Sequence, residues 1–589
     1  IGLMLLWYRL GRRVKKAGGG RERRAQRVER FPSEKLKNLY CIRQSSSMAD
    51  STGVPSSTSA EKVELPRDLK SWFQITENSA TIYYKDKNEV FYNDVQETNR
   101  DLSIAVIRVY QRILEKEKIT RKRRRDGMPS TPTSPRMLSI FEALSATGLR
   151  SIRYFNEITN DSGEHLVKQV VANDLDEAAV KAIQRNVVAN GLDLSRVVPS
   201  HGDANQVMYT SAFNKTFYDV VDLDPYGSAA PFLDAALRVV SHGGILCITC
   251  TDLIILCGKE PDTCYNRYGG WPAKTSKITH EVALRLLLNV VERTAVNHKK
   301  TVEPLTSLFV DFYIRVFVRV RSSGPSTKLA PARYATAYKC TQCATLDLQH
   351  VASTVVKKNG DQRSVPSKAT VSPSCEECGG SKTSFGPIYS APLYDPEFVD
   401  SLIEEVEKNK ERYKAHDRIL TRLRNQRNEL RDVPLFYTLD EMARFLKTTT
   451  PRRLQVEAAI HNHGYRVSGS HTCSSALKTD APASLLWDIM KKLISPTPKG
   501  LKEGTPPHIL FHKPPRHDVN LEISEEERAA YLKEREAPRF LENPNEFWGP
   551  GSRAHGGRKK DTPSDNPGAP PAAKDDTIME EDVSTRNNE

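Results

Sequence analysis

The sequence predicts an α/β fold with a doubly wound parallel sheet, followed by a C-terminal α+β domain. Apolar runs of strand length alternate with helical patterns between residues 137 and 320. Polar side chains follow several of these runs, at the carboxyl ends of the expected strands, where such sheets bind ligands. Two CxxC pairs come after residue 330 in polar, loop-like sequence, which indicates a metal-binding domain.

Length and charge bound the organisation of the chain. Its 589 residues are enough for two or three domains, and its net charge of +14 indicates an acidic partner such as nucleic acid. Residues 1–47 hold thirteen Lys or Arg against three acids. We interpret them as an Arg-rich mitochondrial presequence or as an upstream extension, since Met48 is a candidate start. Residues 48–75, which begin with a Ser/Thr-rich stretch, are expected to be a linker.

Cysteine usage and hydropathy exclude two further classes. The ten cysteines indicate reduced thiols and a metal site in an intracellular protein, not a disulfide framework. The sequence has no run of about 18 apolar residues, so we expect no membrane span. It implies no obligate protein partner.

The first expected elements precede the sheet. Alternating apolar residues in ATIYYKD and NEVFYNDV predict a β-hairpin that leads into a helix from about 97 to 116. Residues 117–135 are expected to form a solvated basic insertion, with RKRRR at 121–125. This run is a nuclear-localisation signal, an RNA-contacting loop or merely a solvated loop.

The sheet is expected to begin at residue 138. Residues 138–141 form the first buried strand, which Glu142 closes, and SATG at 145–148 forms a turn before a helix from Leu149. Small residues allow the backbone to approach a ligand and point a helix N-terminus at it. The full GxGxxG pattern is absent, because Gly148 is the single glycine here.

The next two strands each end in an acid. Asp174 lies 26 residues beyond Gly148, where an acid accepts both ribose hydroxyls of a nucleoside cofactor, although a helix N-cap is an equal alternative. Asp203 follows the third strand in GDAN. It is placed to recognise an adenine amino group, and a purely structural turn explains it equally well.

The fourth strand runs into VVDLDPYGS, residues 220–228, around which the chain is organised. Methylation of an amino group on a flat ring needs acceptors for the amine hydrogens and a surface on which the ring stacks. Asp224 and the Pro225 carbonyl supply the acceptors, and Tyr226 supplies the surface. An Asp-Pro turn or a magnesium ligand is the alternative. A helix at 229–239, the strand of GGILCITCTD, a helix at 280–294 and a strand at 308–320 complete the alternation.

Four cysteines have the spacing of a zinc site. Cys340 and Cys343 form one CxxC knuckle, Cys375 and Cys378 form the other, and 31 residues separate them. Four protein ligands leave no open position, so the zinc is expected to be structural. Unliganded thiols and a redox CxxC are the alternatives. We interpret four further cysteines as core or near-site thiols: Cys247, Cys250, Cys257 and Cys264.

The C-terminal part is expected to bind RNA. Residues 398–432 predict one charged helix with a solvated face. Two helices and a strand-like hairpin then follow, which predict a winged-helix-like unit. Its basic side chains are a candidate RNA-binding surface: Arg452, Arg453, His461, His463 and Arg466. Residues 550–589 have the composition of a disordered tail.

Several motifs occur in the order of one known family. EALSATGLRSIRYF, VVANDLDEAAV, DLDPYG, CTDLIILCG and TCYNRYGG together resemble the tRNA (guanine-26-N2)-dimethyltransferase family over residues 76–490. The resemblance implies a class I, Rossmann-like methyltransferase that uses S-adenosylmethionine. It also implies transfer of one or two methyl groups to the exocyclic N2 of guanine 26 in tRNA.

The resemblance also implies the residues that contact the base. Asp224 matches the catalytic acid of the family's DP[FY]G motif, and Pro225 and Tyr226 match residues that shape the guanine pocket. Phe91, in FYN, matches an aromatic side chain that sandwiches the base.

The cofactor contacts are carried over in the same way. Arg100 matches a contact to the cofactor carboxylate, although the insertion at 117–135 separates it from the turn. Arg150 lies in the cofactor turn, Asp174 matches the ribose acid, and Asp203 with Ala204 matches the adenine contacts.

The sequence therefore predicts a methyltransferase domain at 76–330 and a tRNA-binding, zinc-containing domain at 331–549. One alternative is an amino-methyltransferase for another RNA or DNA base, although DLDPYG differs from the NPPY pattern of adenine enzymes. The other is a non-catalytic, zinc-bearing RNA-binding protein. We expect the protein in the nucleus and the mitochondrion, with the cytoplasm as a further compartment.

Overall fold

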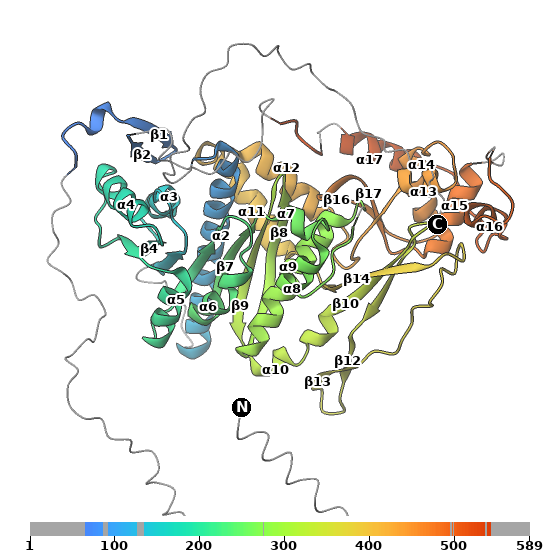
Figure 1. Ribbon diagram of the computed structural model, residues 1–589, viewed down its shortest axis with the longest axis horizontal. Helices are drawn as coiled ribbons and strands as arrows, with labels where there is room; N and C mark the ends of the chain where they lie inside the picture. The colour runs from blue at the N-terminus through green and yellow to red at the C-terminus, as the bar shows by residue number, and fades with distance from the viewer. Residues whose placement is uncertain are drawn as a thin grey trace, which may run out of the picture. The chain divides into compact units, whose positions relative to one another are not determined.

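A seven-stranded sheet lies at the centre of the computed structural model, with the strand order β5-β4-β3-β6-β7-β9-β8 (Figure 1). The structure describes residues 65–543, apart from 86–91, 127–134, 275, 495–497, 499 and 536–538. The predicted extension at 1–47, residues 48–64 of the predicted linker and the predicted tail at 550–589 lie outside these residues. The end of the linker, predicted at residue 75, is wrong, because a 3-10 turn forms at Leu69–Ser71 and the first strand begins at Phe73. The first five strands are β3 (Leu138–Glu142), β4 (Val167–Asp174), β5 (Val197–His201), β6 (Tyr218–Leu223) and β7 (Val240–Cys250). They are parallel and run outward in both directions from β3 and β6, which confirms the doubly wound α/β fold.

One edge of the sheet differs from the prediction. The single strand predicted over 308–320 is wrong, because this region contains parts of two antiparallel strands, β8 (Lys300–Val310) and β9 (Tyr313–Ser322). They are joined by a turn at Asp311, whose φ is 47°. Both strands are largely buried, so the apolar run continues through the turn and hides it. β9 also pairs antiparallel with β7, and the sheet is therefore mostly parallel.

Two hydrophobic cores lie on opposite faces of the sheet. Val220 belongs to the core that includes α2, α3 and α4, and Val221 to the core that includes α5, α6 and α9. Because side chains alternate along a strand, Asp222 and Asp224 lie on the face of Val220.

The helices are α2 (Glu97–Asp126), α3 (Leu149–Glu157), α4 (Glu177–Ala189), α5 (Ala204–Phe213), α6 (Leu233–Val239), α7 (Leu253–Leu256), α8 (Pro261–Tyr268) and α9 (Thr279–Asn297). Among the described residues, no helix has both the length and the apolar character that crossing a membrane requires.

The elements before the sheet also differ from the prediction. ATIYYKD does not begin the hairpin; it contains its second strand, β2 (Ala80–Tyr84), which pairs with β1 (Phe73–Glu77). α2 continues ten residues beyond the predicted end at 116, so the first half of the expected insertion is helical. The physical reason is that residues 117–126 contain neither glycine nor proline and are rich in Lys and Arg, which favour helices.

The C-terminal part begins with small antiparallel sheets. β10 (Tyr334–Cys340) lies between β11 (Leu346–His350) and β14 (Lys382–Tyr389). A separate hairpin of β12 (Ala352–Val356) and β13 (Gln362–Pro366) fills much of the interval between the two CxxC pairs. This hairpin accounts for the long separation of the two pairs in the sequence.

The charged helix predicted at 398–432 is two helices that pack on the core that contains Val220. α11 (Pro396–Lys408) and α12 (His416–Arg427) contact α2 (Figure 1), and apolar residues such as Leu402 and Leu423 are fully buried. The prediction of one solvated helix is therefore wrong. The two helices follow the predicted boundary at residue 330, yet they share a core with α2. The division into domains stays a prediction.

The last described part has the order of elements expected for a winged-helix-like unit. α13 (Leu439–Phe445) and α14 (Arg453–Asn462) precede the hairpin of β16 (Val467–Ser470) and β17 (Cys473–Thr479). β17 also pairs with β15 (Tyr437–Thr438). The unit packs against α15 (Ala483–Leu493), and α16 (Pro506–His512) and α17 (Glu525–Arg535) follow.

Candidate active site and metal centre

The SATG turn lies between β3 and α3, as the sequence predicts. Ala146 and Gly148 have φ values of 48° and 78°, so the backbone there is in the left-handed region. A Cβ on Gly148 would lie 3.2 Å from the Ile183 side chain, so a glycine permits α3 to approach α4. The turn thereby presents an exposed backbone at Ala146 at the carboxyl edge of the sheet.

The acid at the end of β4 borders this turn. The carboxylate of Asp174 accepts hydrogen bonds from the Ala146 N–H at 2.8 Å and from the Asp176 N–H at 3.0 Å. Asp176, not Asp174, is the N-cap of α4, so the helix-cap alternative for Asp174 is wrong. The chemistry of the acid and the small-residue turn fits a nucleoside with free ribose hydroxyls.

The acid at the end of β5 has a structural role that the sequence left open. Asp203 is the N-cap of α5, and its carboxylate accepts a hydrogen bond from the Gln206 N–H at 3.0 Å. Ala204 begins α5 and is buried. Asp203 is exposed at this edge of the sheet.

The loop after β6 is fixed by the segment after β7. The Thr251 N–H donates to the Gly227 carbonyl at 2.8 Å, and the Thr251 hydroxyl accepts from the Gly227 N–H at 2.8 Å. Pro225 is buried, whereas 47% of Tyr226 is exposed. The loop therefore holds an aromatic ring at the surface beside Asp224.

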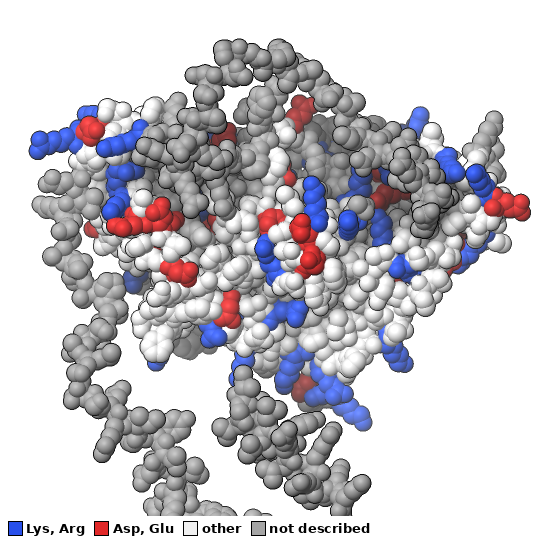
Figure 2. Space-filling view, viewed as in Figure 1, with Lys and Arg blue, Asp and Glu red and all other residues white. Residues whose placement is uncertain are grey.

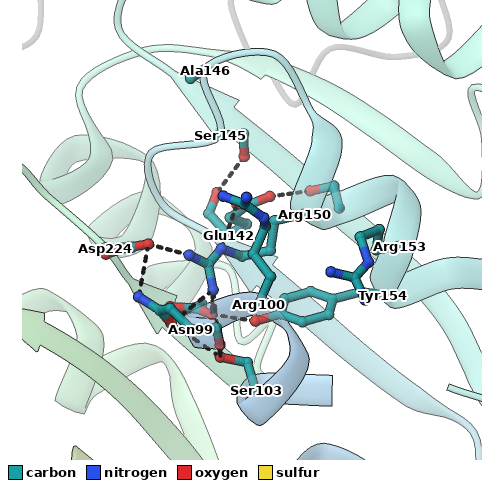
Figure 3. Close-up of polar contacts among 12 residues, drawn as sticks. Asn99, Arg100, Ser103, Glu142, Ser145, Ala146, Arg150, Arg153, Tyr154 and Asp224 are labelled. Atoms are coloured by element: carbon teal, nitrogen blue, oxygen red, sulfur yellow. Dashed lines mark hydrogen bonds and ion pairs between the residues drawn. The ribbon is translucent and has the colours of Figure 1, made fainter. Parts of the chain in front are cut away.

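Arg150 and Asn99 hold the carboxylate of Asp224. The guanidinium of Arg150, from α3, donates to Asp224 Oδ2, and the Asn99 amide, from α2, lies 3.5 Å from the same oxygen (Figure 3). Arg150 also donates to Asn99 Oδ1 at 3.3 Å. Burial lowers the pKa of Arg150, but Asp224 and Asp222 raise it by more than burial lowers it, so the pKa lies well above the ordinary value. The guanidinium is therefore a fixed cation beside the site.

Asp222 lies below Asp224 and is completely buried. Arg315, from β9, donates to its two carboxylate oxygens at 3.0 and 2.9 Å, and the Tyr154 hydroxyl donates to Oδ2. Burial raises the pKa of Asp222, but Arg315 and Arg150 lower it more, so the pKa lies below its usual range. Asp222 is an ionised anchor for the two arginines and is closed to solvent.

Glu142, at the end of β3, is the third acid of this group. Its carboxylate lies 3.4 Å from Nε of Arg150 and accepts a hydrogen bond from the Ser151 hydroxyl. Burial raises the pKa of Glu142 to about 7, although Arg150 opposes the shift. This side chain changes its charge near neutral pH.

The structure places Arg100 one residue from the group around Asp224. Its guanidinium donates from Nε to the buried Glu77 carboxylate at 2.6 Å and lies 5.4 Å from the Tyr92 ring centroid. The insertion does not separate it from the turn, because Asn99 of the same helix contacts Arg150 (Figure 3). Its contact to a cofactor stays a prediction, and Phe91 lies outside the described residues.

The four predicted metal ligands come together. The sulfur atoms of Cys340, Cys343, Cys375 and Cys378 all lie within 4.8 Å of one another and are buried. Sulfur atoms that ligate one tetrahedral zinc at about 2.3 Å are separated by about 3.8 Å. A Cβ on Gly380 would lie 3.1 Å from Cys340 Sγ and 3.3 Å from Cys378 Sγ, so the knuckle leaves no room for a side chain there. The geometry fits a zinc site.

The other cysteines of the predicted catalytic domain do not join this cluster. Cys247 and Cys250 are fully buried and belong to the cores on opposite faces of the sheet. Cys264 is buried and Cys257 is half-buried. Their interpretation as core or near-site thiols is confirmed.

The basic side chains of the winged-helix-like unit are mostly engaged within the chain. Arg466 lies 2.7 Å from Asp432 and 2.8 Å from Asp480. Arg453 pairs with Glu457 at 2.7 Å. Arg452 is exposed. The tRNA-binding surface that we predict here is thus less basic than its sequence indicates.

Sequence reasoning missed Asn99, Tyr154 and Arg315. Arg315 has a recognisable signal, because it is a charge inside the apolar run FYIRVFVRV. A charge that is buried in a sheet requires a partner, and Asp222 supplies it. Asn99 and Tyr154 lie in ordinary helical sequence, and only the fold brings them to the acids.

The sheet order, with one antiparallel strand and polar side chains at successive strand ends, defines a class I, Rossmann-like methyltransferase. The chain belongs to the N2,N2-dimethylguanosine tRNA methyltransferase family, whose model matches residues 71–491. This finding confirms the resemblance seen in the sequence.

Individual relatives agree. The chain is 36% identical to the Homo sapiens tRNA (guanine(26)-N(2))-dimethyltransferase, over 88% of this chain and 82% of that protein. It is 33% identical to the mitochondrial tRNA (guanine(26)-N(2))-dimethyltransferase of Saccharomyces cerevisiae, over 81% and 92% of the two chains. The structure of Trm1 from Pyrococcus horikoshii with S-adenosyl-L-methionine is 25% identical, with a TM-score of 0.57, and covers 71% of this chain and 99% of its own.

Proposed function

We propose that this chain transfers one or two methyl groups from S-adenosylmethionine to the exocyclic N2 of guanine 26 in tRNA. Relatives of the same family carry this activity in their names. The observation that carries the proposal is the carboxylate of Asp224. It is held by Arg150 at the end of β6, and 17% of its side chain is exposed.

Asp224 is suited to guanine N2 because it accepts hydrogen bonds. The amine is a weak nucleophile while its lone pair is conjugated with the ring, and an acceptor on its N–H groups favours the reactive geometry. Arg150 orients the carboxylate, which takes up the proton that the alkylated amine releases. When bound, S-adenosylmethionine supplies an electrophilic methyl group. The remaining catalysis is positioning and electrostatic stabilisation.

The base is positioned by the loop around Asp224. The Pro225 carbonyl is a second acceptor, and the exposed ring of Tyr226 provides a stacking surface. Phe91 is assigned to the opposite side of the base on the resemblance alone.

The cofactor site is assigned to the carboxyl edge from β3 to β5. Asp174 receives the ribose hydroxyls, Asp203 and Ala204 the adenine, and the turn before Arg150 the chain between them. Arg100 is assigned to the cofactor carboxylate.

The C-terminal part is proposed to bind tRNA and to contain structural zinc. The β12–β13 hairpin carries the exposed residues Lys357, Lys358 and Arg363, and Figure 2 shows a group of basic side chains over it. Its strands are largely exposed, so the hairpin contributes little to a hydrophobic core. An exposed basic hairpin is suited to phosphate groups. We assign residues 76–330 to catalysis and 331–549 to tRNA binding.

The enzyme is proposed to act in both the nucleus and the mitochondrion, with the cytoplasm as a further compartment. The support is the Arg-rich segment at 1–47, the RKRRR run at 121–125 and the mitochondrial relative.

A methylation assay tests the function. Purified protein and labelled S-adenosylmethionine are mixed with unmodified tRNA or with the same tRNA carrying adenine at position 26. We expect label in N2-methylated guanosine from the first tRNA only. Equal label in both tRNAs contradicts the substrate assignment. Bound tRNA without any label supports the non-catalytic alternative.

A further inference from the structure

Two aromatic side chains form an exposed stack close to the candidate site. The ring centroids of Tyr265 and Trp271 are 5.3 Å apart with an interplanar angle of 29°, and 44% of each residue is exposed. Aromatic side chains carry large apolar areas that proteins usually bury or use for binding. We call this pair the aromatic platform.

The platform is joined directly to the loop that carries Asp224. Tyr265 lies on α8, one helical turn before Tyr268. The Tyr268 hydroxyl lies 2.7 Å from Ser228 Oγ and 2.7 Å from an Asp252 carboxylate oxygen. Ser228 ends the DLDPYGS motif, so these hydrogen bonds fix α8 against the loop that carries Asp224.

The backbone around the platform is fixed. Trp271 and Gly386 of β14 exchange two backbone hydrogen bonds of 2.8 Å. Gly269 ends α8 with a φ of 71°, and a Cβ on Gly270 would lie 2.6 Å from the Leu286 side chain. The indole is therefore presented by a rigid turn, which reduces the entropy lost on binding.

Basic side chains accompany the platform. Lys259, Lys274 and Lys277 are exposed in the segments on either side of α8. Gly258 and Lys274 lie on touching backbone segments, since a Cβ on the glycine would lie 3.1 Å from Cα of the lysine. Lysines beside an exposed aromatic pair are the combination that binds unpaired nucleic acid.

We propose that the aromatic platform stacks on the base that adjoins the methylated guanine in tRNA. This inference rests on the proposed function. An enzyme that modifies a base takes the base out of its stack, and the adjoining base then loses a stacking partner. Tyr265 or Trp271 replaces that partner and stabilises the extruded state.

A double-mutant cycle tests the contact: one side chain of the protein and one base of the tRNA are removed, separately and together. Trp271→Ala is combined with tRNAs that are abasic at position 25 or at position 27, and the Kd for tRNA is measured beside kcat/KM. With intact tRNA, we expect Trp271→Ala to weaken binding about tenfold, the size of one base–aromatic stack. With one of the abasic tRNAs, the same substitution is expected to have less than a twofold effect. Trp271→Phe is expected to restore most of the binding.

The controls separate this inference from the proposed function and from misfolding. Phe213→Ala removes an 86% exposed aromatic side chain at the end of α5 and should leave tRNA binding unchanged. Binding of S-adenosylmethionine should be unchanged in both variants, because Trp271 is anchored through its backbone. The inference is overturned if Trp271→Ala leaves the Kd for intact tRNA unchanged. It is also overturned if the losses of binding free energy from Trp271→Ala and from the missing base are additive for both abasic tRNAs. If wild-type protein transfers no methyl group, the proposed function fails, while the Kd cycle still decides the contact.

Discussion

Arg150 donates a hydrogen bond to the carboxylate of Asp224 and lies 3.4 and 3.7 Å from Glu142 and Asp222. One guanidinium thus links the ends of β3 and β6, the two strands from which the sheet order reverses. The same residue is the second of α3, directly after the SATG turn. The relationship couples the geometry of the proposed cofactor site to that of the proposed catalytic acid.

Replacing Asp224 by Asn keeps its shape and removes its capacity to take a proton. We expect methyl transfer to fall about 100- to 10,000-fold, the range of general acid–base catalysis, while the Kd for S-adenosylmethionine changes by no more than a few-fold. Single-turnover transfer and calorimetric titration measure the two effects. Near-normal transfer by Asp224→Asn contradicts the assigned role.

Replacing Arg150 by Met leaves three acids with less positive charge beside them. Arg150 lowers the pKa of Glu142 and that of Asp222, so both pKa values should rise in the variant and the acidic limb of the pH–rate profile should move to higher pH. Arg150→Lys keeps the charge and is expected to move the limb less. Profiles that coincide with wild type would show that Arg150 does not act on the carboxylates.

Glu142 makes stability depend on pH near neutrality. Its folded pKa of about 7 exceeds the ordinary value of 4.5, so the folded state holds an additional proton between these pH values. Stability from this group is fully present below pH 4.5 and is lost as pH rises through 7. Glu142→Gln, which cannot ionise, should therefore be more stable than wild type at pH 8, by about 3 kcal/mol, and close to it at pH 4.5.

Urea unfolding at the two pH values measures this difference. Exposed Glu503→Gln is the control and should change nothing at either pH. If Glu142→Gln changes the free energy of unfolding equally at pH 4.5 and pH 8, the raised pKa of Glu142 is contradicted.

Removing zinc should destabilise the C-terminal part. The four cysteines belong to the core that contains α13, α14 and α15, and the Trp487 indole donates to the Thr345 hydroxyl beside Cys343 at 3.2 Å. Structural zinc contributes directly to folding, so chelation and Cys340→Ser should both lower the melting temperature. Cys257→Ser, outside the cluster, is the matched control. An unchanged melting curve after verified zinc removal is the contrary outcome.

The β12–β13 hairpin should contribute electrostatically to tRNA binding. Replacing Lys357 and Lys358 by Gln is expected to reduce the slope of log K against log salt by about 1.5, since each phosphate contact contributes about 0.7 to 0.9. Lys168 and Lys215, exposed at the amino ends of β4 and β6, are the control pair. An equal slope in the two double variants argues against the hairpin as a contact.

Strand periodicity predicted the sheet and the positions of Asp174, Asp203 and Asp224, because a residue after an apolar run must lie at a strand end. The partners of these acids could not be predicted. Arg315 is 93 residues from Asp222, and only the antiparallel return of β9 brings them together. The β8–β9 turn and the α11–α12 pair were missed for one reason: burial by distant parts of the chain overrides the local pattern.

The packing of α11 and α12 on α2 has a consequence for synthesis of the protein. Arg108 of α2 binds the buried carboxylate of Glu405 at 2.7 Å, across 297 positions of sequence. At translation rates of about 5 to 20 residues per second, α2 leaves the ribosome roughly 15 to 60 s before its partner. During that interval the nascent N-terminal part carries an uncovered apolar face, and Arg108 lacks its carboxylate partner. Its native core can close only after the chain has passed the zinc-binding region.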